Sequence, residues 1–301
     1  MNLVSALRDR LGEQGVRVDE PMARHNTFKI GGPADVFVMP SNTDELAFVL
    51  KTCRDADVPC FVLGNGSNLL VHDGGIRGVT ISMMGMTQIA CEDNKIHAQG
   101  GVLLPVLSRF ALKYGLSGLE FAEGIPGSVG GGVVMNAGAY DGEIADVFCY
   151  ATLINMQNQI ILMDNSAMAF SYRKSAAQAN NLVVAEVVFT LTPTESDEIA
   201  AKMADLREQR ISKQPLDKPS AGSAFKRPPG KFAGKLIMDA GLRGYSIGGA
   251  QVSEKHCGFI VNKGSATAAD VIALMEHVIQ VVRSKTGITL ESEVKIVGEC
   301  E

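Results

Sequence analysis

A glycine-rich stretch of seventeen residues, 124–140, constrains the fold of this chain more than any other feature. Its sequence is Gly-Ile-Pro-Gly-Ser-Val-Gly-Gly-Gly-Val-Val-Met-Asn-Ala-Gly-Ala-Tyr, with six glycines, whereas the whole chain has 32 in 301 residues. Glycine lacks a Cβ, so such a segment can turn at positive φ and present consecutive main-chain amides to an anion. A phosphate-binding loop and a plain hairpin between core strands both fit, and this stretch alone does not decide between them.

A second polar glycine loop lies between two apolar runs. Its sequence from Leu63 is Leu-Gly-Asn-Gly-Ser-Asn-Leu-Leu-Val, and the runs at 59–63 and 69–71 predict strand, tight turn and strand. Gly64-Asn65-Gly66 begins like a dinucleotide fingerprint, but Leu69 replaces the third glycine and a strand follows instead of a helix. A Rossmann site is therefore disfavoured. No Gly-Lys-Ser or Gly-Lys-Thr follows a glycine loop either, which excludes a P-loop.

Together the two loops resemble the FAD-binding part of the vanillyl-alcohol-oxidase-like flavoproteins and, in detail, the family of UDP-N-acetylenolpyruvoylglucosamine reductases. The resemblance extends from about Asn26 to Val297. It includes the Asn-Thr-Phe-x-Ile-Gly-Gly segment that starts at Asn26 and the Tyr172-Arg173 pair. Only about eight residues separate that pair from the next predicted strand. A passage this short is typical of the type II class of the family.

The resemblance implies an α+β fold, in which a two-part FAD-binding domain of the vanillyl-alcohol-oxidase (PCMH) type precedes a smaller C-terminal α+β substrate domain. The expected divisions are 1–24 for an N-terminal helix and lead-in, 25–193 for the FAD-binding domain and 194–301 for the substrate domain. Apolar periodicity predicts helices at 2–14, 41–56, 103–114, 195–211, 233–244 and 267–283. It predicts strands at 36–39, 60–63, 69–71, 79–82, 95–98, 148–156, 160–163, 182–191 and 259–262. Ser41 or Thr43 is expected to cap the second helix, and a break is expected at 85–91.

Composition excludes several other classes of function. The net charge is −5 and no basic cluster exceeds a pair, so we expect neither nucleic-acid binding nor membrane insertion. The N-terminus lacks a signal-peptide pattern and no apolar run reaches about 18 residues, which predicts a cytoplasmic protein. The six cysteines contain no Cys-x-x-Cys and the five histidines no His-x-x-x-His, so we expect free thiols and no metal site. The oligomeric state stays open, and a monomer is compatible with the sequence.

The resemblance implies that the two glycine loops wrap the diphosphate of a noncovalently bound FAD. Serine, asparagine and tyrosine side chains accompany the loop glycines at these positions. The corresponding residues are Gly64, Asn65, Gly66, Ser67, Asn68, Gly124, Pro126, Gly127, Ser128, Gly130, Gly131, Asn136, Gly138, Ala139 and Tyr140.

The resemblance also implies the activity of a UDP-N-acetylmuramate dehydrogenase. NADPH would reduce FAD, which would reduce UDP-N-acetylglucosamine enolpyruvate to UDP-N-acetylmuramate, a step of peptidoglycan precursor synthesis that serves cell-wall formation, cell shape and division. Arg173 corresponds to the family arginine that holds the substrate carboxylate and neutralises the enolate, and Ser223 to the proton donor. Glu293 corresponds to the glutamate that polarises the enol carboxyl group. Alternation along a strand would place Glu291 on the same face, so only the family register selects Glu293.

Three further residues correspond to substrate-binding positions. Lys213 matches a lysine that the family uses on the substrate phosphate, and Tyr172 precedes the catalytic arginine. Arg227 stands where many members carry asparagine, although a guanidinium would also suit a phosphate. Two other interpretations remain. A related flavin enzyme such as an alcohol oxidase would bind its flavin covalently and would not need Ser223 or Glu293, and a nucleotide-binding regulator would not need the catalytic trio.

Overall fold

The computed structural model describes residues 3–300 and divides the chain into two compact units. Unit 1 consists of Met1–Val18, Val36–Asn65 and Gly78–Arg210. Unit 2 consists of Asp19–Asp35, Gly66–Arg77 and Ile211–Glu301. Each unit is therefore assembled from segments that are far apart in the sequence.

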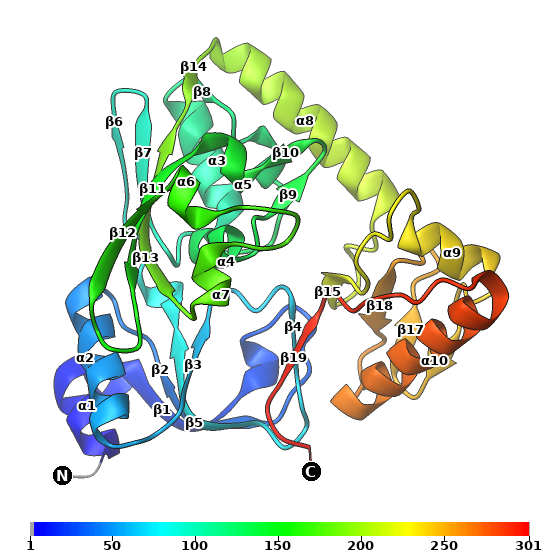
Figure 1. Cartoon of the computed structure of the whole chain (residues 1–301), viewed down its shortest axis with the longest axis horizontal. Helices are drawn as coiled ribbons and strands as arrows, with labels where there is room; N and C mark the ends of the chain where they lie inside the picture. The colour runs from blue at the N-terminus through cyan, green and yellow to red at the C-terminus, as the bar shows by residue number, and fades with distance from the viewer. Residues whose placement is uncertain (1–2, 301) are drawn as a thin grey trace. The chain divides into compact units, whose positions relative to one another are not determined.

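The larger sheet of unit 1 has five strands, and every neighbouring pair is antiparallel. In spatial order the strands are β12 (Ile160–Asp164), β11 (Phe148–Ile154), β13 (Val183–Thr190), β7 (Lys95–Gln99) and β6 (Ile89–Glu92) (Figure 1). Helices α3 (Leu104–Lys113) and α4 (Val129–Val134) contribute Leu107 and Val133 to a buried core that also contains Ile96, Val187 and Phe189. This core supports the glycine-rich stretch, which contains α4.

The N-terminal part of the chain, residues 16–82, supplies a four-stranded sheet, most of which belongs to unit 1. Its spatial order is β1 (Val16–Pro21), β2 (Pro33–Val38), β5 (Ile76–Ser82) and β3 (Cys60–Leu63). Helices α1 (Leu3–Leu11) and α2 (Thr43–Asp55) cover it with Leu7, Leu46 and Val49, which pack with Val38 and Ile81. The β3 strand pairs in parallel with β5 and ends at Leu63, so this core holds the start of the first glycine loop.

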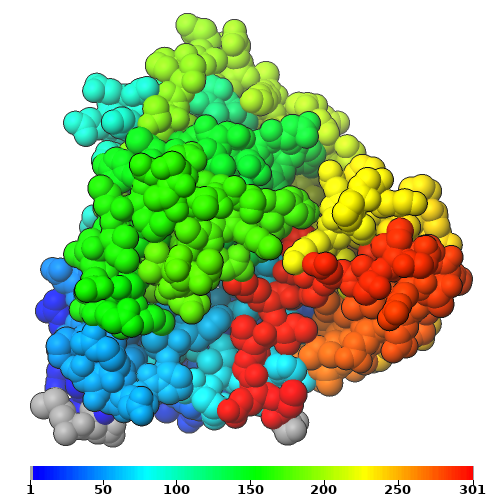
Figure 2. All heavy atoms as spheres, in the orientation of Figure 1, coloured from blue at the N-terminus to red at the C-terminus, as the bar shows by residue number. Residues whose placement is uncertain are grey.

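Short elements complete unit 1, and they include the connections around the glycine-rich stretch. They are η1 (Glu13–Gly15), η3 (Met83–Gly85), β8 (Leu116–Ser117), η4 (Glu120–Ala122), β9 (Gly138–Ala139), β10 (Gly142–Glu143), α5 (Ile144–Val147), α6 (Asn165–Met168), α7 (Ala176–Ala179) and β14 (Thr192–Pro193). The long helix α8 (Ser196–Lys213) follows and carries the chain from unit 1 into unit 2. Residues of the segment coloured green form much of the visible surface of unit 1 (Figure 2).

Unit 2 is built on a second antiparallel sheet and one long helix. The four strands, in spatial order, are β15 (Ser220–Ser223), β18 (Phe259–Asn262), β17 (Ala250–Val252) and β16 (Ser246–Ile247). Its other elements are η2 (Met22–Arg24), β4 (Leu69–Val71), α9 (Ala233–Asp239), α10 (Ala268–Thr286) and β19 (Lys295–Val297). Strand β19 pairs in parallel with β4, and Leu70 joins the buried core formed with α10.

Several elements agree with the sequence predictions. Strands β3, β4 and β18 have the predicted bounds. The helix predicted from residue 267 is present and begins with a capping box: the Thr267 hydroxyl accepts the Asp270 amide at 3.1 Å and the Asp270 carboxylate accepts the Thr267 amide at 3.2 Å. None of the helices in the described part of the chain combines the length and the apolar character needed to cross a bilayer.

Two local predictions are wrong. The cap of α2 is Asn42, not Ser41 or Thr43: its side-chain oxygen accepts the Glu45 amide at 2.9 Å. Asparagine is among the strongest N-cap residues, and its position here lets Ser41 bond to the Glu45 carboxylate instead. The expected break at 85–91 contains the start of β6, which pairs with β7 through a turn at Asp93, a residue with φ of 52°.

The structure also forms a short helix, α4, inside the glycine-rich stretch, where the sequence predicts a loop or a hairpin. Glycine has a low helix propensity, so tertiary contacts stabilise this helix. Ser128 caps it by accepting the Gly131 amide at 3.3 Å. The Gly130 amide donates to the Gly100 carbonyl at 2.8 Å, and a Cβ at Gly130 would lie only 3.1 Å from that oxygen. The glycines therefore allow the helix to pack directly on neighbouring main chain.

Cys53 and Cys60 form a thiol pair where α2 leads into β3. All six cysteines are free thiols. A hydrogen bond from Cys53 holds the pKa of Cys60 below its usual range, and the same contact raises the pKa of the buried Cys53 thiol. We therefore expect Cys60 to react with iodoacetamide at a lower pH than Cys91, whose pKa is raised by burial and by Asp93.

Peptide mass spectrometry after alkylation at a series of pH values measures both midpoints in one sample. Replacing Cys53 by alanine removes the donor and should move the Cys60 midpoint to higher pH. A Cys60 midpoint that equals or exceeds that of Cys91 in the unaltered chain would contradict the assignment.

Candidate functional site

The two glycine loops touch each other inside unit 1. A Cβ on Gly64 would lie 2.3 Å from the Ser128 hydroxyl oxygen, so only glycine fits there without displacement. The Asn65 side-chain amide donates to the Pro126 carbonyl at 2.6 Å. Ser128 is also the cap of α4. The first loop therefore rests on the turn that begins the glycine-rich helix, and the structure brings together two segments about sixty residues apart in sequence.

Several amides at this contact donate to no acceptor in the part of the chain that the structure describes. No hydrogen bond among residues 3–300 uses the amide of Gly64, Asn65, Gly127 or Ser128 as its donor. Gly127 is buried, and Ser128 is only 1% exposed. Buried amides in proteins are almost always paired, so those of Gly127 and Ser128 indicate an acceptor that is not part of the chain, and the partly exposed amides of Gly64 and Asn65 lie beside them on the first loop. A diphosphate has the charge and the oxygens to accept them, and the residues present therefore fit FAD.

The glycine-rich stretch is tied to the loop that carries Arg173. Asn136 is fully buried and has φ of 43°. Its side-chain oxygen accepts the Ala145 amide at 3.0 Å, and its side-chain amide donates to the Ser171 carbonyl at 3.3 Å. Ser175 adds a hydrogen bond from its hydroxyl to the Val134 carbonyl at 2.9 Å. Both the oxygen and the amide of the Asn136 side chain are bonded to the chain. Asn136 would therefore support a cofactor indirectly, by fixing the glycine-rich stretch to the loop that carries Arg173.

Arg173 lies at the tip of a tight turn with a left-handed backbone. Its φ is 58°, and the main chains of Ser171 and Lys174 exchange two hydrogen bonds around it. The guanidinium lies 4.9 Å from the Tyr172 ring centroid and donates to the Gly138 carbonyl at 3.3 Å. Positive φ is uncommon outside glycine and is concentrated at functional sites. The turn thus directs a cation along the end of the glycine-rich stretch.

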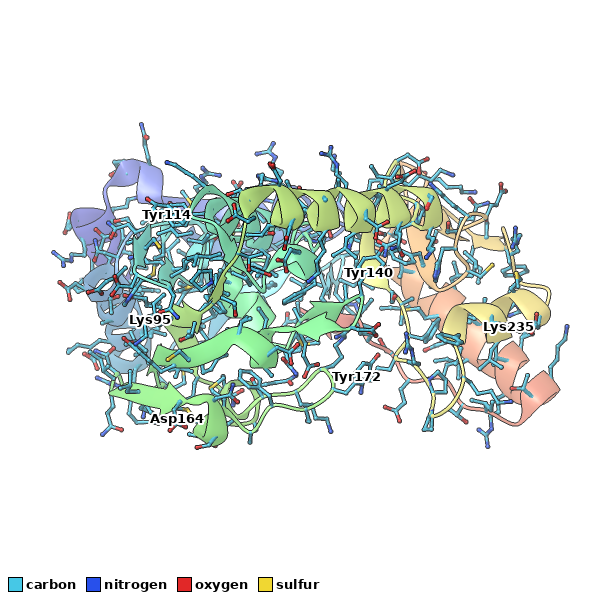
Figure 3. The ribbon with its side chains drawn as sticks, turned by 90° about the horizontal axis from the view of Figure 1, so that it is seen from above. Lys95, Tyr114, Tyr140, Asp164, Tyr172 and Lys235 are labelled. Carbon is cyan, nitrogen blue, oxygen red and sulfur yellow. The ribbon has the colours of Figure 1, made fainter. Side chains whose placement is uncertain are left out.

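Tyr140 and Tyr172 mark this end of unit 1 in Figure 3, whereas Lys95, Tyr114 and Asp164 lie toward its other end. Tyr140 has φ of 52° and the following Asp141 has φ of 64°, so left-handed turns occur on both loops. Sequence reasoning missed one neighbour of this region, Arg210 of α8, which packs against Gly124. A single arginine in a charged helix carries no pattern that would select it.

Ser223 and Glu293 lie next to each other in unit 2. Ser223 ends β15 opposite Phe259, directly after Gly222, which has φ of 75°. The Glu293 amide donates to the carbonyl of Ala224, the residue after Ser223, at 3.0 Å. The side-chain amide of Asn68, from the first glycine loop, donates to the Glu293 carbonyl at 3.1 Å. The structure therefore brings three predicted site residues of unit 2 together.

The structure also distinguishes the two neighbouring glutamates. Glu291 is 74% exposed at its side chain and forms an ion pair with Lys226 at 3.2 Å. Glu293 is only partly exposed and lies on the segment held between Ala224 and Asn68. The two glutamates therefore have different surroundings, and Glu293 stays the residue predicted from the family register.

The other predicted residues of unit 2 occupy a turn, a helix end and a loop. The turn at Gly66 has φ of 62°, its carbonyl accepts the Thr27 amide at 3.3 Å, and a Cβ there would lie 2.4 Å from the His25 carbonyl oxygen. Ser67 follows it as a half-buried residue. Lys213 is the last residue of α8, and the Arg227 guanidinium lies 4.7 Å from the centroid of the Phe232 ring.

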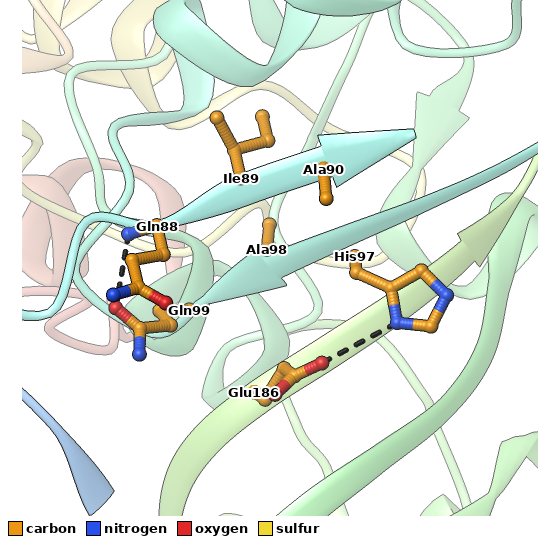
Figure 4. Close-up of a pocket in the computed structure, with 7 residues that line it drawn as sticks. All are labelled: Gln88, Ile89, Ala90, His97, Ala98, Gln99 and Glu186. Carbon is orange, nitrogen blue, oxygen red and sulfur yellow. Dashed lines mark hydrogen bonds and ion pairs between the residues drawn. The ribbon is translucent and has the colours of Figure 1, made fainter. Parts of the chain in front are cut away.

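A depression on the five-stranded sheet is a different feature. It has a volume of about 360 Å³ and is lined by Gln88, Ile89, Ala90, His97, Ala98, Gln99 and Glu186 (Figure 4). His97 contacts Glu186 there, with Nδ1 at 3.4 Å from a carboxylate oxygen. None of the predicted site residues lines it. Among the described residues, no group of three or more His, Cys, Asp or Glu side chains is placed to hold a metal ion.

Comparison with known proteins gives matches to both parts of the chain. Residues 34–163 match a family described as an FAD binding domain, and residues 214–297 match the C-terminal domain of UDP-N-acetylenolpyruvoylglucosamine reductase. A UDP-N-acetylenolpyruvoylglucosamine reductase of Clostridium botulinum (strain Okra / Type B1) is 49% identical over 298 residues, which cover 99% of this chain and 97% of that protein. One from Agathobacter rectalis is 50% identical over 309 residues, with 98% of each protein covered.

A solved structure of similar name is also close. The crystal structure of UDP-N-acetylenolpyruvylglucosamine reductase from Thermus caldophilus has a TM-score of 0.79 and 35% sequence identity. The match covers 93% of this chain and 99% of that one. The similarity therefore includes both parts of the chain and not the glycine loops alone.

Proposed function

This chain belongs to the UDP-N-acetylenolpyruvoylglucosamine reductase family, and from that membership we propose how its residues divide the work of the reaction. The resemblance and the α+β fold class with an FAD-binding domain, both predicted from the sequence, are confirmed. The protein is an FAD-containing, NADPH-dependent oxidoreductase that makes UDP-N-acetylmuramate for peptidoglycan synthesis. Its substrate is UDP-N-acetylglucosamine enolpyruvate.

The FAD diphosphate is bound where the two glycine loops meet. The observation that carries this proposal is the pair of amides in the buried residues Gly127 and Ser128, which donate to no acceptor among residues 3–300, with the Ser128 side chain against Gly64. FAD held there would supply the redox chemistry, the transfer of a hydride from NADPH to the double bond of the substrate. The protein itself supplies position, charge and a proton.

Arg173 binds the substrate carboxylate in this proposal. As the enolpyruvyl double bond is reduced, negative charge moves onto the carboxyl group, and a guanidinium can stabilise that charge through two parallel hydrogen bonds. The left-handed turn and the contact with Gly138 support the role, because they fix the side chain before substrate binds. Tyr172 beneath the guanidinium limits its motion further.

Ser223 donates the proton to the carbon next to the carboxylate. A serine hydroxyl is a weak acid, so it can act here only because the enolate-like intermediate is a strong base. Glu293 polarises the enol carboxyl group. The hydrogen bond between the Glu293 amide and the Ala224 carbonyl supports a role of both residues in the same reaction, because it holds the segments that carry the Ser223 hydroxyl and the Glu293 carboxylate side by side. Lys213 and Arg227 contribute positive charge for the substrate diphosphate.

The proposal retains 25–193 as the FAD-binding region and 194–301 as the substrate-binding region, after a lead-in at 1–24. Matches of 34–163 and 214–297 to two separate family models support this functional division. It also includes a cytoplasmic location, since the family acts on nucleotide-linked precursors with NADPH. Fractionation of cells that produce the tagged full-length chain tests the location, and recovery in the salt-washed membrane pellet would contradict it.

One spectroscopic experiment tests the function. The purified protein should show an oxidised flavin spectrum, which NADPH bleaches under anaerobic conditions and UDP-N-acetylglucosamine enolpyruvate restores. Failure of the substrate to restore the oxidised spectrum would overturn the reductase reaction while leaving flavin binding intact. Flavin that stays with the acid-precipitated protein would indicate a covalent link and favour an oxidase. A colourless protein that binds nucleotides without consuming NADPH would favour a regulator.

Glu293 and Glu291 allow a prediction with a matched control. Glu293→Gln keeps the size of the side chain and removes its charge, so it should slow flavin reoxidation by substrate about 10²-fold, within the usual range for a single acid–base or electrostatic group. Glu291→Gln, two residues away and exposed to solvent, should leave the rate unchanged. Rapid-mixing measurements of flavin absorbance check both variants. Equal loss in the two would mean that the segment matters only for folding.

A further inference from the structure

Arg210 lies directly on Gly124, the first glycine of the glycine-rich stretch. A Cβ on Gly124 would be 2.5 Å from the Arg210 Cδ, 3.2 Å from Nε and 3.3 Å from Nη1. Gly124 has no positive φ, so its backbone would accept an ordinary side chain. We therefore attribute the glycine at this position to the room that the arginine needs.

Helix α8 holds Arg210 in this position. Ile199 and Met203 are buried, at 3% and 7% exposure. Met203 follows Ile199 by four residues and Arg210 follows Met203 by seven, so the three positions share one face of the helix. Lys202 forms an ion pair at 3.2 Å with Glu120, whose carboxylate also accepts the Ser117 hydroxyl at 2.6 Å. Burial alone would raise the pKa of Glu120, but these hydrogen bonds and the lysine charge lower it, so the pair stays ionised. The helix is thus fixed to unit 1 before Arg210 is reached.

The Arg210 guanidinium has no anionic partner in the described part of the chain. Within residues 3–300 no hydrogen bond or ion pair involves it. The acid next to Gly124, Glu123, is already paired with Arg109 at 3.2 Å. Burial lowers the pKa of Arg210, and only the Tyr140 phenol acts in the opposite direction. A desolvated cation without a counter-ion destabilises a fold, so such a residue is typical of a site that binds an anion.

We propose that Arg210 binds a phosphoryl group of a nucleotide held along the glycine-rich stretch. The inference rests on the function proposed above and extends it to a residue that the sequence did not select. Both neighbours of the guanidinium, Gly124 and Tyr140, belong to the stretch assigned to FAD, so its diphosphate is the favoured source of the phosphoryl group. The substrate diphosphate and the NADPH phosphates have the same chemistry, and the test separates the three. A charged hydrogen bond of this kind is worth about 10- to 100-fold in affinity.

The test compares Arg210→Met, which keeps the length and removes the charge, with Arg210→Lys, which keeps the charge. Flavin release from the purified holoenzyme is followed by fluorescence on dilution, and KM is measured for NADPH and for UDP-N-acetylglucosamine enolpyruvate. We expect Arg210→Met to weaken FAD retention by about 10- to 100-fold and Arg210→Lys to recover part of it. A rise in KM for one nucleotide instead would assign the phosphoryl group to that nucleotide. No change in any of the three affinities would overturn the proposal.

A structural explanation predicts a different pattern. If Arg210 only packed α8 against unit 1, its removal would lower the melting temperature of the flavin-free protein, as Lys202→Met should do by breaking the pair with Glu120. An anion-binding Arg210 predicts the opposite sign, because Arg210→Met removes a half-buried charge without an anionic partner among residues 3–300 and should leave the flavin-free protein at least as stable. Gly124→Ala, which displaces the guanidinium but retains it, should also weaken FAD retention. Unaltered protein that binds no flavin would refute the proposed function and not this residue assignment alone.

Discussion

Replacing Ser223 by alanine should leave NADPH reduction of the flavin intact and slow reoxidation by UDP-N-acetylglucosamine enolpyruvate by about 10²- to 10⁴-fold, the usual range for a placed proton donor. The two half-reactions separate because the hydroxyl takes part only when the substrate carbon accepts its proton. Rapid mixing under anaerobic conditions, with flavin absorbance as the signal, measures each half-reaction by itself.

Ser220→Ala is the matched control, because Ser220 starts the same strand, β15, and its carbonyl, not its hydroxyl, accepts the bond from Thr27. The control should reoxidise at the normal rate. If Ser223→Ala slows both half-reactions equally, the residue supports the fold or the cofactor and not proton transfer. Full reoxidation by Ser223→Ala would assign the proton to another donor.

Gly64→Ala should produce a folded protein with at least about tenfold less bound flavin, the loss expected when one or two charge-assisted hydrogen bonds are broken. The new methyl carbon would lie 2.3 Å from the Ser128 hydroxyl oxygen and must displace it. Ser128 would then leave the amide of Gly131, and the unpaired amides of Gly127 and Ser128 would move out of position. Flavin content per protein, read from the visible spectrum of the purified sample, is the measurement.

A double variant identifies the cause. Ser128→Ala alone removes the cap of α4 and should cost about 1 kcal/mol of stability. Combined with Gly64→Ala it also removes the oxygen that the new methyl would strike, and the next nearest atoms, the Ser128 Cβ and the Gly131 nitrogen, lie at 3.4 and 4.0 Å. The double variant should therefore bind more flavin than Gly64→Ala. If the flavin loss of the double variant equals the sum of the losses of the two single variants, the steric explanation is excluded.

Most regular elements could be predicted because their signals are local. Strands β3 and β18 are short apolar runs with polar or glycine ends, and α10 begins with a complete capping box. Helix α4 could not be predicted in this way, because Val-Gly-Gly-Gly-Val-Val opposes helix formation and the helix depends on tertiary contacts, among them those with Gly100 and Leu104. Strand β6 was missed although the Asp93-Asn94 pair that follows it is typical of a tight turn; its residues alternate between half-buried and exposed in the structure.

The candidate site shows a similar division between pattern and context. Glycine density located both loops, but the contact of Gly64 with Ser128 depends on tertiary structure. Arg173, Ser223 and Glu293 were selected by family resemblance, since an isolated arginine, serine or glutamate has many other uses. Arg210 was selected by neither, because its significance arises from the absence of an anionic partner among residues 3–300, which no sequence pattern expresses.

The discontinuous make-up of unit 2 has a consequence for how the protein is synthesised. Strand β4 leaves the ribosome more than two hundred residues before β19, its parallel partner at the C-terminal end. Leu70 can be buried only after α10 and β19 have been synthesised, so the core of unit 2 cannot be completed before β19 has left the ribosome. A fragment that starts at residue 194 would lack β4 altogether and leave β19 unpaired. We expect such a fragment to aggregate when produced alone, and a separately supplied peptide containing β4 to improve its recovery.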